Sequence, residues 1–126
     1  MEIPIKLHYT KEHEWASLEN SVVTVGITDY AQSELGEIVF VELPEVGETC
    51  SVGNTFGVIE AVKTVADLYA PVTGEIIEIN AKLSDHPELV NKSAFGEGWM
   101  IKIKVENAKE WETLMSANEY KAMIEG

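Results

Sequence analysis

The stretch Trp99-Met100-Ile101-Lys102-Ile103-Lys104-Val105 is the clearest indication of the fold in this sequence. Apolar residues fall at every second position from Trp99 to Val105, lysines lie between them, and only Met100 breaks the alternation. Because successive side chains of a strand point to opposite faces, this pattern predicts a strand with one buried face. We therefore expect Trp99 and Ile101 to pack in the core.

Other apolar runs extend this reading along the chain. They are short, bounded by Gly or Pro, and lie at residues 22–25, 38–43, 56–59, 68–72 and 75–79. Many short, punctuated strands favour a mostly β protein built as a sandwich or a barrel. At 126 residues the chain has the length of one domain, with enough surface to bury for one core.

Helices are expected to be few and short. Asp29 followed by Gln32 has the spacing of a capping box, and Gly36 is placed to end that helix. The same spacing recurs at residues 107–110 and 116–119. Apolar residues behind both of these caps repeat at helical intervals, which predicts a helical C-terminus with one face on the sheet.

One internal similarity stands out. Gly36–Val41 resembles Gly74–Ile79 at an offset of 38 residues. The pair fits a duplicated unit that folds onto its copy with approximate two-fold symmetry. Chance resemblance is a serious rival explanation, because short Gly-Glu-Ile strings arise easily in a glutamate-rich chain.

Charge excludes several functions. The chain has 22 acidic residues against nine lysines and no arginine, which gives a net charge of −13. Such a chain repels nucleic acid and anionic membranes alike, and no run approaches the 18 apolar residues of a membrane span. The single cysteine, Cys50, has no partner for an intrachain disulfide. With no signal-peptide pattern at the N-terminus, the expected location is the cytoplasm.

The sequence contains no motif for catalysis or metal binding. Phosphate-binding loops, the dinucleotide-binding glycine pattern and the nucleophile elbow are all missing. His8, His13 and His86 lack the spacing of metal ligands. We therefore expect neither an enzyme nor a metal site.

Lys63 is the one position that points to chemistry. It is the only cation between Lys11 and Lys82, and residues 12–81 contain 13 acidic residues. If the flanking segments are strands, Lys63 lies near the tip of their turn, where a second enzyme can reach its amine. The turn has no Gly, Asn or Asp, so a helical turn that pairs Glu60 with Lys63 is an equal alternative.

At these residues the chain resembles the H-protein family of the glycine cleavage system. The hairpin motif is Glu60-Ala61-Val62-Lys63, continued by Asp67-Leu68-Tyr69-Ala70-Pro71-Val72-Thr73-Gly74-Glu75. The resemblance extends over about residues 8 to 124 and includes the segments 9–15, 25–32, 35–44, 89–91 and 96–100. The chain departs from the family pattern at Ala61, at Thr64-Val65 and at Ala94-Phe95.

The resemblance implies a fold and a function. The fold is a barrel-sandwich hybrid of two antiparallel sheets with short helices, formed by a single lipoyl-carrier domain over residues 1–126. Lys63 would carry lipoic acid in a covalent amide. The carrier would shuttle an aminomethyl group from glycine decarboxylase to aminomethyltransferase and reducing equivalents to dihydrolipoamide dehydrogenase. A lipoate ligase or a lipoyl/octanoyl transferase would attach the cofactor.

The same resemblance implies roles for four further residues and leaves alternatives. Glu14 and Asp67 match a cleft in which carboxylates would pair with the amine of the loaded arm. Glu60 matches a position for recognition of the hairpin, and Val62 precedes the attachment lysine. The alternatives are a lipoate-relay variant that donates lipoyl groups to other lipoyl domains, and an interaction module without a cofactor. A biotin carrier is disfavoured because no Met-Lys-Met surrounds the lysine.

Overall fold

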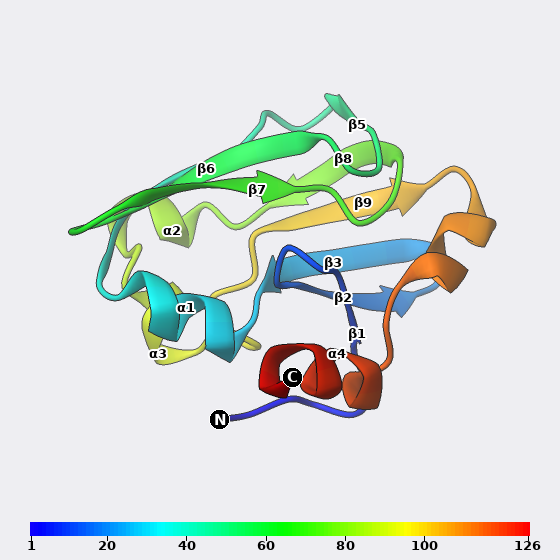
Figure 1. Ribbon diagram of the computed structural model, residues 1–126. Helices are drawn as coiled ribbons and strands as arrows, with labels where there is room; N and C mark the ends of the chain where they lie inside the picture. Colours follow the sequence, from blue (N-terminus) through cyan, green and yellow to red (C-terminus); the bar gives the residue numbers. More distant parts are fainter.

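Two antiparallel β-sheets face each other in the computed structural model, which describes all 126 residues (Figure 1). The larger sheet has the order β1 (His8–Tyr9), β2 (Glu14–Glu19), β3 (Val22–Ile27), β9 (Ile101–Val105), β8 (Gly74–Ile79) and β5 (Thr49–Cys50). The smaller sheet has the order β4 (Ile38–Glu42), β6 (Thr55–Ala61) and β7 (Val65–Tyr69). The expected mostly β sandwich is confirmed. No helix is long and apolar enough to cross a bilayer.

The core lies between the sheets and consists of alternate strand residues. Ile101 and Ile103 on β9 and Ile59 on β6 are almost completely buried within a cluster of 19 apolar side chains. The expectation that Trp99 packs in this core is wrong. The regular strand begins only at Ile101, so the buried residue before it is Met100, while Trp99 is half-buried and its ring lies under the Lys102 ammonium.

The helices are short and cover the ends of the sandwich. They are α1 (Asp29–Leu35), α2 (Lys82–Asp85), α3 (Leu89–Lys92) and α4 (Ala117–Glu125), with a 3-10 helix at Ala108–Thr113. Gly36 ends α1 with φ +82°, as expected for a residue that must adopt a left-handed conformation. The predicted cap at Asp29 is one residue late, because the side chain of Thr28 accepts the Ala31 N–H.

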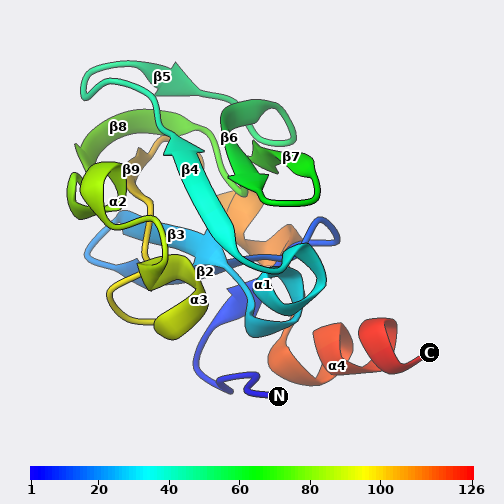
Figure 2. The same ribbon diagram turned by 90° about the vertical axis from the view of Figure 1, so that its left-hand side faces the viewer.

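The C-terminal helix α4 begins at the predicted cap and rests on a second, smaller core. Ser116 and Glu119 form a reciprocal capping box. Behind this cap, Tyr120 is fully buried and stacks on Tyr9 with ring centroids 4.7 Å apart. Figure 2 shows α4 at the end of the molecule that also holds the N-terminus.

The two similar segments each form a strand, one in each sheet. Gly36–Val41 contributes β4 to the smaller sheet, and Gly74–Ile79 forms β8 of the larger one. The pairing register shifts between Ile38 and Phe40 in β4 and, at the same offset of 38 residues, between Ile76 and Glu78 in β8. A shared irregularity of this kind favours the duplicated unit over chance.

Candidate functional site

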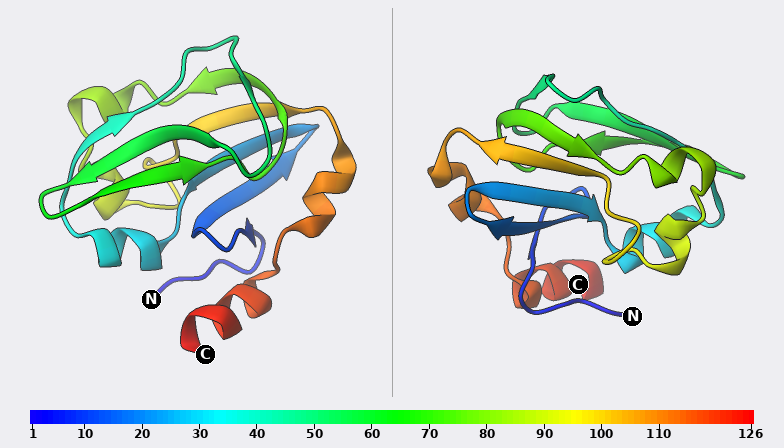
Figure 3. Two further views of the ribbon diagram at one scale, coloured as in Figure 1. Left: turned by 45° about the horizontal axis from the view of Figure 1, so that its top comes forward. Right: turned by 180° about the vertical axis from the view of Figure 1, so that it is seen from behind.

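Lys63 lies at the tip of the hairpin formed by β6 and β7. The Ala61 N–H donates to the Thr64 carbonyl at 2.8 Å, which closes the turn, and the Val62 N–H donates to the Glu37 carbonyl at 3.0 Å. Strands flank the turn on both sides, so the helical alternative is wrong. Figure 3 shows this green hairpin reaching beyond the cyan helix α1. The turn therefore holds Lys63 exposed on a rigid support.

The end of the Lys63 side chain lies beside Gly36. A Cβ atom built on Gly36 would be 3.5 Å from Lys63 Cε and 4.0 Å from Nζ, which is ordinary van der Waals contact. Lys63 forms no ion pair in the structure. The amine thus stays available at the point where α1 ends.

A cleft of about 280 Å³ lies between α1 and the hairpin, and we call it the hairpin cleft. Its three walls are residues 12–14 at the start of β2, the side of α1 that carries Tyr30, Ala31, Glu34 and Leu35, and strand residues 59 and 66–68. Apolar side chains form much of the lining, and carboxylates of Glu14 and Asp67 lie among them. Such a space suits an apolar chain that ends in a cation.

Glu14 is the most unusual residue of this cleft. Its side chain is 1% exposed, accepts a hydrogen bond from the Thr10 hydroxyl, and accepts another from the Tyr69 N–H at 3.1 Å. Burial raises the pKa of Glu14 from 4.5 to about 7, because the hydrogen bonds offset only part of the loss of water around the carboxylate. The group therefore changes charge near neutral pH.

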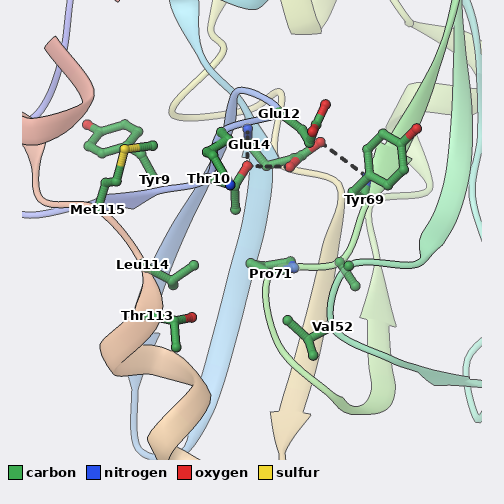
Figure 4. A pocket seen from close by; sticks show the side chains of 13 residues that line it. Tyr9, Thr10, Glu12, Glu14, Val52, Tyr69, Pro71, Thr113, Leu114 and Met115 are labelled. Carbon is green, nitrogen blue, oxygen red and sulfur yellow. Dashed lines mark hydrogen bonds between the residues drawn. The ribbon is translucent and has the colours of Figure 1, made fainter. Parts of the chain in front are cut away.

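A second hollow of about 350 Å³ lies on the other side of Glu14 (Figure 4). Tyr69, Pro71 and Val52 form one side of it, and Leu114 and Met115 form the other. Glu14 lines both spaces, so its carboxylate forms part of the partition between them.

The structure brings some of the expected site residues together and separates others. Glu14 and Asp67 line the same cleft. Glu60 lies outside it, in register with Phe40 on β4 and Val65 on β7. Val62 is 71% exposed in the turn beside Lys63. The five residues thus divide into a tip, a cleft and an outer face, and their individual roles stay predictions.

Sequence reasoning missed most of the cleft residues, among them His13, Tyr30 and Glu34. His13 was considered only as a metal ligand, yet no group of three or more side chains in the structure could hold a metal ion. It has φ +73° at the end of the β1–β2 turn, and its ring packs against Tyr30 at 4.9 Å. For Tyr30 and Glu34, the available signal in the sequence was the short helix α1, marked by its cap and its terminal glycine.

A stiff β-sandwich that presents one exposed lysine beside an acidic cleft has the architecture of a carrier domain. A family model described as "Glycine cleavage H-protein" matches residues 7–126. The chain therefore belongs to the glycine cleavage H-protein family.

Individual relatives agree with this assignment. The chain is 54% identical over 126 residues to the glycine cleavage system H protein of Bacteroides thetaiotaomicron, which covers 100% of both chains. It is 52% identical over 124 residues to that of Staphylococcus epidermidis, which covers 98% of each. The crystal structure of the H protein from Mycobacterium marinum superimposes with a TM-score of 0.88 at 38% identity, covering 98% of this chain and 100% of that one.

Family membership settles the class of function. The chain is a lipoyl carrier protein of the glycine cleavage system rather than an enzyme. The names of its relatives favour this role over the lipoate-relay alternative.

Proposed function

We propose that Lys63 is the attachment point of lipoic acid, joined through an amide to Nζ, and that residues 1–126 form a single lipoyl-carrier domain. The observation that supports this is the exposed, unpaired amine at the tip of the β6–β7 hairpin. A modifying enzyme must reach the amine from solvent, and a rigid turn limits the conformational cost of presenting it. Acylation would remove one positive charge and change the net charge from −13 to −14.

The proposed cofactor supplies a dithiolane that takes up an aminomethyl group and electrons. The carrier would present it in turn to glycine decarboxylase, aminomethyltransferase and dihydrolipoamide dehydrogenase. A strongly acidic carrier surface speeds encounters with basic docking sites without requiring tight binding, which suits a shuttle between several enzymes. A lipoate ligase or a lipoyl/octanoyl transferase would modify the lysine.

The hairpin cleft fits the cargo end of such an arm. Leu35 and Leu68 offer apolar contact, and the carboxylates of Glu14 and Asp67 would pair with a protonated amine. Glu60 and Val62 lie outside the cleft, where an attaching enzyme would read the hairpin.

The proposal includes a location in the cytoplasm. Cys50 is a buried free thiol whose Sγ lies 3.5 Å from the Val72 carbonyl. A protein held together without disulfides is compatible with a reducing compartment.

Intact-mass measurement tests the attachment site. The wild-type chain, produced together with a lipoate ligase and lipoate, is expected to gain one lipoyl increment. Lys63→Arg keeps the charge and removes the acylatable amine, so it is expected to gain none. Lys82→Arg is the matched control, because Lys82 is also exposed, on α2, and its replacement leaves Lys63 available.

Two outcomes would contradict the proposal. One is a lipoyl increment that persists in Lys63→Arg. The other is an unmodified wild type under conditions in which the same ligase modifies a known lipoyl domain.

A further inference from the structure

The hydroxyl of Tyr120 on α4 lies at the centre of a buried hydrogen-bond chain. It is 2.7 Å from Thr28 Oγ1 and 2.8 Å from His13 Nδ1. Tyr120 is fully buried and Thr28 is 1% exposed, so water does not compete for these groups. The three residues lie 92 and 107 positions apart in sequence, and only the fold brings them together.

This one hydroxyl joins two walls of the hairpin cleft. His13 belongs to the wall formed by the β1–β2 turn, and Thr28 caps α1, which forms the opposite wall. The Thr28 N–H also donates to the His13 carbonyl at 3.0 Å. The C-terminal helix therefore holds both walls from behind without lining the cleft with Tyr120 itself.

The donors and acceptors in this hydrogen-bond chain determine which group donates each hydrogen bond. The Ala31 N–H can only donate, and it occupies one lone pair of Thr28 Oγ1. The buried Thr28 proton then has a single acceptor in reach, the Tyr120 oxygen, because a buried polar hydrogen is expected to be bonded. Tyr120 must in turn donate its own proton to His13 Nδ1. That leaves His13 with its proton on Nε2.

The acidic groups around His13 favour its protonated form. The hydrogen-bond chain favours the neutral form against them. Carboxylates of Glu12 and Glu14 on its own turn, Glu34 on α1 and Asp67 on β7 share the cleft with the imidazole. Burial nevertheless lowers the pKa of His13, despite the opposing pull of the acidic neighbours. A protonated imidazole would also have to donate from Nδ1 and would leave one of the two hydroxyl protons, that of Thr28 or that of Tyr120, without an acceptor.

We propose that Tyr120 is a positioning residue of the cleft, whose hydroxyl holds His13 as a neutral imidazole protonated on Nε2. This arrangement makes α4 the element that sets the polarity of the cleft wall. The consequence for the arm rests on the proposed function: a neutral His13 leaves the surrounding carboxylates free to pair with a cationic cargo. A protonated His13 would repel that cargo and neutralise the cleft.

Nitrogen-15 NMR of the histidine side chains tests the proposal. The Lys63→Arg chain is used throughout, because it carries no acyl group and the result then does not depend on whether Lys63 is lipoylated. His13 is expected to show a single neutral tautomer, with a protonated Nε2 and an unprotonated Nδ1, and to titrate below its ordinary pKa. Adding Tyr120→Phe removes the donor to Nδ1. The tautomers should then mix, and the pKa of His13 should rise because the neutral imidazole loses the hydrogen bond that favoured it.

Tyr9→Phe is the matched control. Tyr9 is also fully buried, stacks on Tyr120 and loses one hydroxyl bond, to the Pro4 carbonyl, without touching His13. It is expected to lower stability to a similar degree and to leave the His13 signals unchanged. Equal changes in both variants would show that Tyr120 is only structural and would overturn the proposal.

The NMR measurement on the protein that retains Tyr120 tests the proposal even if the Tyr120→Phe variant does not fold. A His13 protonated on Nδ1, or a mixture of both tautomers, would contradict the proton order derived above. A wild-type chain that stays unmodified in the mass experiment would refute the attachment site and leave this result standing.

Discussion

Replacing Glu14 by glutamine should make the protein more stable at alkaline pH and leave it almost unchanged in acid. The buried carboxyl has a pKa raised from 4.5 to about 7, so the native chain keeps a proton that the unfolded chain has lost between these values. Stability contributed by this proton is complete below pH 4.5 and is lost as the pH rises through 7. At about 1.4 kcal/mol per pH unit, the loss amounts to about 3 kcal/mol. Glutamine has no such titration and keeps an oxygen that can accept the Tyr69 N–H.

The assay is urea unfolding at several pH values from 5 to 8.5. The difference in free energy of unfolding between Glu14→Gln and wild type cancels the groups that the two proteins share. It should rise with pH towards about 3 kcal/mol in favour of the variant. Glu12→Gln removes a charge from an exposed position of the same turn and should change stability by no more than about 0.5 kcal/mol. A difference that is flat across the range, or that falls with rising pH, would refute the reasoning.

Two further substitutions test the fold that supports the site. Gly57→Ala should lower the free energy of unfolding by about 1–3 kcal/mol, because the Cβ of the alanine would collide with the Glu42 backbone carbonyl on the paired strand β4. An unchanged thermal midpoint would contradict this prediction. Ser116→Ala should cost about 1 kcal/mol by removing the cap of α4, and Ser116→Asn should recover most of it. Equal urea midpoints for the alanine and asparagine variants would show that the cap contributes little.

Sequence periodicity predicted the sheets because strand side chains alternate strictly between core and solvent. The β9 pattern around Ile101 and Ile103 is reproduced in the structure. The ends of the strands were less predictable. The apolar run 68–72 lies in a strand only as far as Tyr69. The strand β5 has only two residues and therefore no alternating pattern to detect. The cap of α1 was misplaced because Thr28 and Asp29 are both good capping residues, and only backbone geometry separates them.

The site was predictable only in part. Lys63 stood out because its charge is isolated, and its position at a hairpin tip followed from the flanking strands. Burial of Glu14 was hidden, since one carboxylate among 22 acidic residues carries no local sign of its surroundings. The contact between His13 and Tyr120 spans 107 positions, so no local pattern contains it.

The absence of a side chain at Gly36 affects the volume that a group attached to Lys63 can reach. The end of the Lys63 side chain, at Cε and Nζ, lies beside this residue and so points towards the end of α1. A tether that leaves its anchor in one preferred direction sweeps a smaller volume than one that is free at its root. Its far end therefore reaches a higher local concentration on the side of the molecule where α1 lies.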